Sequence, residues 1–379
     1  MKISHILYSG VGGQAGVVFT MVRASGASVT HGLAFYGSEE VAAANARTCG
    51  ELGVVYGAFR KGYGVDLGGQ WRMAKWIASE RPDVIVTHNP AAVLGAKIAA
   101  KKCGAKVVLV EHHSNVLKGR KEWAMSLAGH LLADCAVYLT ESYRECVRAK
   151  LGKFFDEAKS RVIPNGLELG AYGERVGSRR AGGVVVGMQG RMVRGKDFGT
   201  LLRAVARMRH GKFFQSLRVE LAGDGPEMSR LQRMVKELRI DGTVHFLGML
   251  PQAELAERMR GWDVFVLSTL GETMSVALME AQACGLPVVA TDVSGVSDVV
   301  ADGENGFLVE PGDDAAMALR MVELISDEGL RRLFGRRSIG YAEAELPASL
   351  MWERYRAVFV ETSNENGRPG ASDVAAASV

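Results

Sequence analysis

The sequence predicts an α/β protein with two parallel sheets, because short β-branched runs alternate with helical patterns along all 379 residues. A chain of this length exceeds one ordinary hydrophobic core and suggests two or three domains. Apolar residues make up 47% and charged residues 23%, which excludes a wholly disordered chain. No run of 18 apolar residues is present, so no membrane-spanning helix is expected.

Seven short apolar runs in the first half are typical of parallel strands, since turns and helical patterns separate them. They are residues 3–8, 29–34, 53–56, 84–87, 106–110, 135–139 and 161–163. Helical patterns at residues 71–80, 91–102 and 122–132 supply crossover connections.

The second half repeats this alternation with six runs. They are residues 183–188, 218–222, 244–247, 264–267, 287–290 and 306–309. Between the halves, residues 164–183 are rich in turn residues and lack periodicity. The sequence therefore predicts domains at residues 1–165 and 166–345. A helix at about residues 346–361 is expected to pack back on the first domain, and residues 362–379 are expected to form a disordered tail.

Charge is distributed unevenly between the halves. Residues 1–165 carry 21 Lys and Arg against 13 Asp and Glu, a formal charge of +8, whereas the whole chain carries +4. The basic half either attracts an anionic acceptor or a phospholipid surface, or is a solvated face without a partner. Five cysteines without a CxxC pair argue against a disulfide framework and favour the reducing cytoplasm.

A glycine-rich loop, residues 9–16, follows the first strand and begins a helix. Gly12 and Gly13 would let backbone N–H groups approach an anion at the positive end of that helix. The spacing matches neither a Walker motif nor the dinucleotide fingerprint. A tight turn without a ligand is the alternative.

Residues 190–197 place Arg191 and Lys196 at the end of the first strand of the second half. Ligands of open α/β sheets bind at the carboxyl ends of strands. One planar guanidinium and one mobile ammonium would suit a diphosphate there. The alternative is a solvated basic turn.

Two glutamates, Glu272 and Glu280, stand eight residues apart around an almost wholly apolar helical pattern. A carboxylate on a buried helix needs hydrogen-bond donors, and the adjacent hydroxyls of a ribose would supply them to Glu280. Glu272 precedes the helix beside the N–H groups of Met274 and Ser275, which suit phosphate or sugar oxygens. An acid favoured by the helix dipole is the alternative, and it explains Glu272 better than Glu280.

Eight motifs in this order resemble glycosyltransferase family 4, densely over residues 162–313 and more loosely over the first half. They are the loop 9–16, 162–166 (VIPNG), Gly190-Arg191 with Lys196, 222–226 (AGDGP), 246–248 (FLG), Glu272 with Glu280, 283–289 (ACGLPVV) and 305–307 (NGF). The resemblance implies the α/β GT-B fold, in which two Rossmann-like doubly wound domains face each other across a cleft. It also implies retaining transfer of a hexose from a nucleotide sugar, with a UDP-sugar as the expected donor. A glycan, a lipid-linked molecule or a small molecule is the expected acceptor, in cell-envelope glycan biosynthesis.

The resemblance further implies roles for the charged residues of the second half. Arg191 and Lys196 match the pair that neutralises the donor diphosphate. Glu280 matches the acid that binds the nucleoside ribose, and Glu272 matches the acid near the donor sugar.

The resemblance also implies roles for five uncharged residues. Met274 and Ser275 would offer backbone amides to the donor, and Leu247 would line the base pocket. Gly12 and Gly13 match the loop of the first domain that closes on phosphate and acceptor.

The family places a histidine after the fifth strand, facing the donor sugar, and this chain has His112 and His113 there. Adjacent side chains of an extended chain point in opposite directions, so only one of them should face the cleft, and His112 is favoured. His88, at the end of the fourth strand, is a further candidate for an acceptor or sugar contact, with a structural role as the alternative.

No metal is implied, since the chain has no Asp-x-Asp motif and Arg191 and Lys196 would do the work of Mg²⁺. We expect no cofactor beyond the nucleotide-sugar co-substrate, no nucleic-acid partner, and a cytoplasmic location with peripheral membrane association as an option. Two alternatives share the fold. One is a nucleotide-sugar 2-epimerase, which needs no separate acceptor. The other is a non-enzymatic sugar-nucleotide-binding protein, which is expected to lack one or more of Arg191, Lys196 and Glu280.

Overall fold

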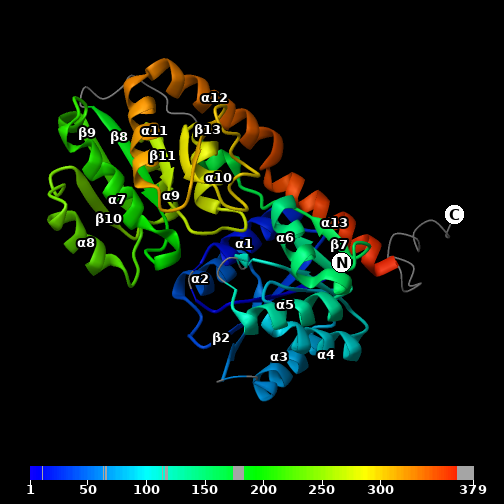
Figure 1. The fold of residues 1–379 in the computed structure, drawn as a ribbon. Coiled ribbons are helices and arrows are strands. Elements are labelled where there is room, and N and C mark those ends of the chain that lie inside the picture. Colours follow the sequence, from blue (N-terminus) through cyan, green and yellow to red (C-terminus); the bar gives the residue numbers. More distant parts are fainter. Residues whose placement is uncertain are drawn as a thin grey trace. The chain divides into compact units, whose positions relative to one another are not determined.

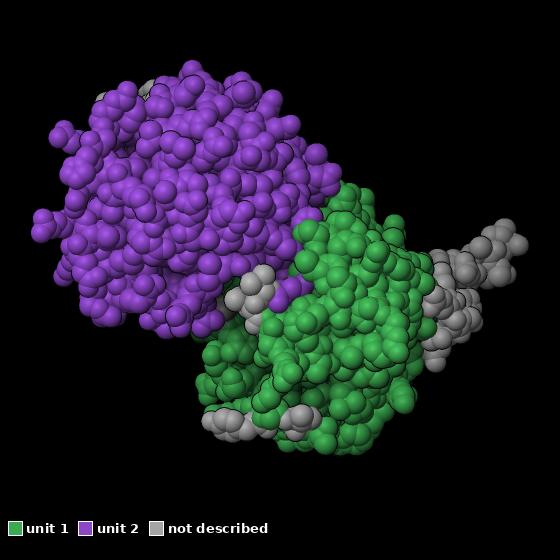
Figure 2. All heavy atoms as spheres, viewed as in Figure 1, with its two compact units in different colours: residues 1–113, 118–166, 348–379 green, residues 114–117, 167–347 purple. Residues whose placement is uncertain are grey.

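The computed structural model describes residues 1–10, 12–62, 64, 66–112, 114–115, 118–173 and 183–364 (Figure 1). The chain divides into two compact units (Figure 2). The N-terminal unit comprises residues 1–113, 118–166 and 348–379, and the C-terminal unit comprises residues 114–117 and 167–347.

The N-terminal unit is built on a seven-stranded sheet in the order β3-β2-β1-β4-β5-β6-β7. Its strands are β1 (Lys2–Leu7), β2 (Thr30–Gly37), β3 (Val55–Arg60), β4 (Val84–Thr87), β5 (Lys106–Val110), β6 (Cys135–Tyr138) and β7 (Ser160–Val162). All neighbouring strands are parallel, which confirms the predicted sheet. Strand order reverses between β1 and β4, and ligands of such sheets bind beside that switch point.

Alternate residues of these strands are buried under different helices, because successive side chains of a strand point to opposite faces. Ile6 and Ala34 pack with residues of α3 (Leu67–Ser79) and α4 (Val93–Cys103). Leu7 and Phe35 pack instead with residues of α1 (Gly13–Ser25) and α2 (Ala43–Glu51). The remaining helices of this part of the chain are α5 (Arg120–Leu132) and α6 (Glu141–Leu151).

The last helix, α13 (Ala348–Asn364), belongs to the N-terminal unit and packs against α1 (Figure 1). Its buried Trp352, Tyr355 and Phe359 recur at helical spacing and form its inner face. The predicted tail therefore begins too early, because residues 362–364 continue the helix and Thr362 is buried. Residues 365–379 of that tail lie outside the described part of the chain.

The C-terminal unit is built on a six-stranded parallel sheet in the order β10-β9-β8-β11-β12-β13. Its strands are β8 (Val184–Gln189), β9 (Leu217–Ala222), β10 (Val244–Gly248), β11 (Val264–Leu267), β12 (Val288–Thr291) and β13 (Gly306–Val309). Its helices are α7 (Phe198–Arg207), α8 (Met228–Glu237), α9 (Gln252–Arg260), α10 (Val276–Ala283), α11 (Asp314–Ser326) and α12 (Glu328–Glu345). Here the strand order reverses between β8 and β11.

One close approach of backbone at the carboxyl edge of this sheet requires glycine. A Cβ on Gly223, after β9, would lie 2.0 Å from the carbonyl oxygen of Gly190, after β8. Gly223 also has a φ of 129°, which L side chains rarely adopt. The loops after β8 and β9 therefore lie closer together than any other residue would allow.

Within the described ranges, no helix combines the length and the apolar character that crossing a bilayer requires.

Candidate functional site

Three predicted site residues of the C-terminal unit lie beside its switch point. Arg191 and Lys196 follow β8, and Glu272 follows β11, which is the neighbour of β8 across the reversal of strand order. Because the two strands are parallel, their carboxyl ends share one edge of the sheet. Residues separated by about 80 positions in sequence are therefore brought together.

Hydrogen bonds join the two loops that carry these residues. Ser268 Oγ donates to the carbonyl oxygen of Asp197 at 2.9 Å, and Thr269 Oγ1 donates to that of Gly195 at 3.1 Å. The Leu270 N–H donates to the Gly195 carbonyl at 2.8 Å. Asp197 itself has a left-handed φ of 40°, a conformation that costs free energy in a non-glycine residue. The turn around Lys196 is thus held against the loop that leads to Glu272.

The charged side chains at this edge differ in their surroundings. Lys196 Nζ forms an ion pair with Glu272 Oε1, and the Glu272 side chain is largely buried. Arg191 is exposed, and no carboxylate of the described residues pairs with it. An anion arriving at this edge would meet one unpaired guanidinium and one ammonium that already has an acidic partner.

Glu280 lies on α10, a helix that is buried nearly all round, and its own exposure is only 6%. The Tyr172 hydroxyl donates to Glu280 Oε1 at 2.6 Å, and Gln189 Nε2 donates to Oε2 at 2.6 Å. Gln252 Nε2 donates in turn to the Tyr172 hydroxyl at 3.1 Å. Burial of this carboxylate agrees with the sequence prediction, and each of its oxygens has one protein donor.

Sequence reasoning missed both of these donors. Gln189 had a signal, because it is a polar residue that ends a buried strand directly before Gly190 and Arg191. No sequence signal identifies Tyr172, because it lies in the turn-rich segment between the two predicted domains.

Burial raises the pKa of Glu280 from its ordinary value of 4.5 to about 7, while the Tyr172 hydrogen bond opposes this rise. Between these two pH values the folded protein keeps a proton that the unfolded chain has released. Raising the pH through this window therefore favours unfolding.

Wild-type protein should accordingly lose stability relative to a Glu280→Gln variant as the pH rises from 4.5 to about 7. The expected change in the difference of unfolding free energy is about 3 kcal/mol. Denaturant titrations of both proteins at several pH values across this window measure it. A difference that stays constant would contradict the raised pKa.

The other predicted donor contacts of this unit lie at the same edge. Met274 and Ser275 are buried immediately before α10, and Ser275 Oγ has no hydrogen-bond partner among the described residues. Leu247 is half-buried at the carboxyl end of β10, which β9 separates from β8. Ser275 is therefore a buried hydroxyl that a ligand at the start of α10 would be able to satisfy.

The first glycine-rich loop lies at the switch point of the N-terminal sheet, after β1. Gly12 is extended, with a φ of 177°, and a Cβ built on it would meet no atom within 4 Å. The missing side chain of Gly12 therefore leaves open space beside the loop. Helix α1 begins directly afterwards at Gly13. Gln14 fixes the loop, because its Nε2 donates to the His88 carbonyl at 2.7 Å and its Oε1 accepts from the Tyr8 N–H at 3.2 Å.

The predicted histidines of this unit follow the next two strands of the sheet. His88, directly after β4, is buried. Its Nε2 lies 3.2 Å from His5 Nδ1, and its Nδ1 lies 3.0 Å from His112 Nε2. Both ring nitrogens of His88 therefore have protein partners, as in the structural role that the sequence analysis gave as the alternative. His112 is half-buried after β5. His113 lies outside the described residues, so the preference for His112 remains a prediction.

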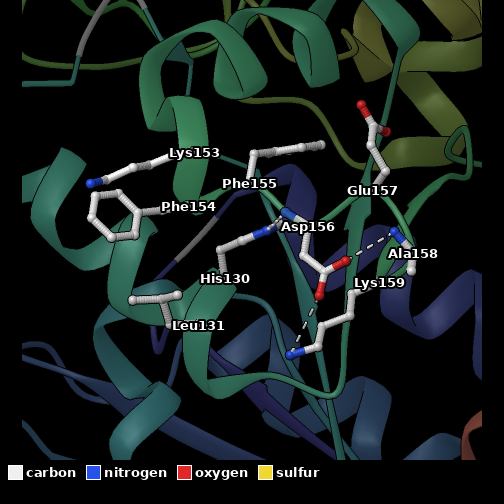
Figure 3. Close-up of a pocket in the computed structure, with 9 residues that line it drawn as sticks. All are labelled: His130, Leu131, Lys153, Phe154, Phe155, Asp156, Glu157, Ala158 and Lys159. Atoms are coloured by element: carbon white, nitrogen blue, oxygen red, sulfur yellow. Dashed lines mark hydrogen bonds and ion pairs between the residues drawn. The ribbon is translucent and has the colours of Figure 1, made fainter.

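A pocket of about 430 Å³ lies elsewhere in the N-terminal unit (Figure 3). It is lined by His130, Leu131 and residues 153–159, between the end of α5 and the loop before β7. This is the amino-end edge of the strands, whereas the predicted site residues follow their carboxyl ends. In Figure 3 the Asp156 carboxylate lies between the Ala158 N–H and the Lys159 ammonium, so the loop is held by its own side chains.

In the described ranges, no three His, Cys, Asp or Glu side chains gather as metal ligands would.

Two family models match this chain, one in each half. A family model described as Glycosyltransferase Family 4 matches residues 11–170, and one described as Glycosyl transferases group 1 matches residues 183–327. A D-inositol 3-phosphate glycosyltransferase of Stackebrandtia nassauensis is 30% identical over 271 residues, which are 67% of this chain and 58% of that protein. An exopolysaccharide phosphotransferase, SCO2592, of Streptomyces coelicolor is 28% identical over 76% of this chain and 29% of its own length. The matched part of the chain thus spans less than two thirds of the length of each of these two relatives.

Solved structures resemble the whole chain at low sequence identity. Anabaena Alr3699/HepE in complex with UDP-glucose has a TM-score of 0.81 at 18% identity, covering 95% of this chain and 100% of that one. A glycosyltransferase of Rickettsia africae has a TM-score of 0.80 at 16% identity, covering 96% and 98%. Together with the two parallel-sheet units, these likenesses confirm the GT-B fold.

Proposed function

Because this chain belongs to glycosyltransferase family 4, we propose that it is a retaining, metal-independent hexosyltransferase that uses a UDP-sugar donor. The acceptor would be a hydroxyl of a glycan, a lipid-linked molecule or a small molecule. The observation that carries the proposal is the grouping of Arg191, Lys196 and Glu272 at the switch point of the C-terminal sheet. The UDP and UDP-glucose complexes of the Anabaena protein support the choice of donor.

The donor diphosphate would be bound by the two cations after β8. Arg191 would form a bidentate contact with phosphate oxygens, and Lys196 would share its charge between phosphate and Glu272. Positive charge held at the leaving group stabilises the negative charge that grows there in the transition state. This contribution replaces the one that a divalent cation makes in other sugar transferases.

The nucleoside and the sugar would be bound by the residues around α10. Glu280 would accept hydrogen bonds from the ribose hydroxyls through the lone pairs that Tyr172 and Gln189 leave available. Ser275, with its unsatisfied buried hydroxyl, would contact a phosphate or sugar oxygen. Glu272 would accept from a hydroxyl of the donor sugar, and the family resemblance gives His112 the role of a donor-sugar contact.

The transfer would proceed on one face of the sugar. The bond between the anomeric carbon and the diphosphate oxygen breaks, and the acceptor hydroxyl oxygen bonds to the same face of that carbon. The acceptor proton passes to the leaving diphosphate, which departs as the nucleoside diphosphate. The basic N-terminal half, with its formal charge of +8, would favour an anionic acceptor and a place at the inner surface of the membrane.

A panel of nucleotide sugars tests this function. Each compound is added to the purified protein in buffer containing EDTA, and the unfolding temperature is measured. We expect one UDP-sugar to raise it, since a ligand at a hundredfold excess over its Kd adds about 2.7 kcal/mol to stability. That UDP-sugar should also yield free UDP when acceptors are added, at a rate that EDTA does not change.

The possible results separate the alternatives. Loss of turnover in EDTA with recovery in Mg²⁺ would contradict metal independence. Interconversion of the UDP-sugar without any acceptor would indicate a 2-epimerase, and stabilisation without turnover would indicate a binding protein. If no nucleotide sugar stabilises the protein, the proposal is wrong.

A further inference from the structure

Four histidines of the N-terminal unit form one continuous line of hydrogen bonds. His112 Nε2 lies 3.0 Å from His88 Nδ1, and His88 Nε2 lies 3.2 Å from His5 Nδ1. His5 Nε2 in turn lies 3.1 Å from His31 Nδ1. The line ends at Ser25, whose Oγ is 2.9 Å from His31 Nε2.

The line crosses the sheet diagonally, because His31 is paired with Ile3 rather than His5, and His5 is paired with Val86, two residues before His88. His31 and His5 lie on β2 and β1, on the sheet face that α1 covers, and His88 and His112 directly follow β4 and β5. The ring of Trp352 on α13 contacts the His31 ring edge-on, with centroids 6.2 Å apart. The line therefore runs from the packed interior to a residue that is proposed to contact the sugar.

All four imidazoles are neutral at pH 7, because burial lowers their pKa values. The pKa values of His31 and His112 fall to about 4, and those of His5 and His88 fall well below 6.5. A neutral imidazole has one N–H donor and one nitrogen that only accepts. Each ring in the line therefore donates on one side and accepts on the other.

Ser25 decides the direction of the line. Its hydroxyl has a single hydrogen, which it donates to the Val22 carbonyl at 2.8 Å. Ser25 Oγ must then accept from His31 Nε2–H, which leaves His31 Nδ1 to accept from His5. The same reasoning repeats along the line, so each ring donates through Nε2.

We propose that Ser25, His31, His5 and His88 are positioning residues that hold His112 in one tautomer, with hydrogen on Nε2 and the accepting lone pair on Nδ1. His112 would then meet a sugar hydroxyl as a hydrogen-bond acceptor. Only this last consequence rests on the proposed function, because the tautomer follows from contacts within the N-terminal unit. Groups that orient the ring of a functional histidine act in this way in other active sites.

His130 provides an internal reference with the opposite tautomer. The Asp156 N–H donates to His130 Nε2 at 2.7 Å, so Nε2 is the accepting nitrogen. His130 Nδ1 must then carry the hydrogen and donate to the Tyr138 hydroxyl oxygen at 3.0 Å. One protein should therefore contain both tautomers in separate buried histidines.

Nitrogen-15 NMR of histidine-labelled, ligand-free protein at neutral pH tests the assignment. Single His→Gln variants assign the signals of the chain's eight histidines. We expect a protonated Nε2 and an unprotonated Nδ1 for His5, His31, His88 and His112, and the reverse for His130. A protonated Nδ1 in any of the four, or an imidazolium, would overturn the proposal whatever the enzymatic activity proves to be.

Two variants of Ser25 test what sets the direction. Ser25→Ala removes the acceptor at the end of the line, so both tautomers should appear in His112, whereas Ser25→Thr keeps a hydroxyl and should preserve one. In Ser25→Ala, kcat should fall about twofold, in proportion to the His112 fraction that has lost the Nε2–H tautomer, with the donor KM unchanged. A single Nε2–H tautomer retained in Ser25→Ala, or a kcat that does not follow the His112 populations, would refute the positioning role. If no transferase activity is found at all, the NMR result still stands as the test of the tautomer.

Discussion

Replacing Lys196 by Ala should lower kcat about a hundredfold, as the loss of other preorganised charges in active sites does. The ammonium lies at the switch point of the C-terminal sheet, where Glu272 holds it in place. Its removal would take positive charge away from the proposed leaving diphosphate, and it would leave the largely buried Glu272 carboxylate without its partner. Both changes disfavour the negative charge that grows on the leaving group in the transition state. We therefore expect kcat to fall by a larger factor than the affinity for the donor. Steady-state kinetics with the donor identified by the nucleotide-sugar panel measure the two effects.

A matched control is the same substitution on the outer surface of this unit. Lys236 is an exposed lysine on α8, and Lys236→Ala should leave kcat and KM unchanged. Thermal unfolding of both variants shows whether they fold alike. Full turnover in Lys196→Ala would exclude a role for this ammonium in leaving-group stabilisation.

Replacing Glu280 by Gln should weaken UDP binding by about 10- to 150-fold, because a hydrogen bond to a charged group contributes about 1.5–3 kcal/mol. The substitution keeps the shape of the side chain and removes the carboxylate that is proposed to accept hydrogen bonds from the ribose hydroxyls. Calorimetric titration of each protein with UDP gives the Kd directly. An unchanged Kd would refute the ribose role of Glu280.

Tyr172→Phe separates ribose binding from the local packing around Glu280. This variant keeps the ring and removes the hydroxyl that donates to Glu280, so UDP affinity should stay within a few-fold of wild type. Glu254→Gln, the same chemical change at an exposed position on α9, should have no effect. If Tyr172→Phe weakens UDP binding as much as Glu280→Gln does, then Glu280 acts by holding the Tyr172 segment.

The strands were predictable because their signals are local. A short apolar run followed by a turn identifies a buried parallel strand within a window of about ten residues, and each predicted run corresponds to one of β1–β13. The bounds shift by a few residues where flanking side chains continue the pattern, as in β2, which extends to Gly37. The end of α13 was missed for the opposite reason. Thr362 and Ser363 are typical of coil, yet their hydroxyls donate to carbonyl oxygens one turn earlier and they stay helical.

The candidate site was predictable only in part. The order of motifs identified Arg191, Lys196, Glu272 and Glu280, and the structure places three of them at one switch point and buries the fourth on α10. Their partners were not predictable, because Tyr172, Gln189 and the pairing of Lys196 with Glu272 depend on which loops meet at the sheet edge. Single residues 70 to 110 positions apart carry no periodic signal of contact.

The amino-acid sequence by itself determined the two parallel sheets, the family and the identity of the charged groups, since hydrophobic period and motif spacing are properties of neighbouring residues. Tertiary structure alone decided the partners of those groups, including the line from Ser25 through His31, His5 and His88 to His112. The physical reason is the crossover connection of a parallel sheet. It brings β2, β1, β4 and β5 side by side in an order that differs from their order along the chain, and so aligns imidazoles that the sequence scatters over more than 80 residues.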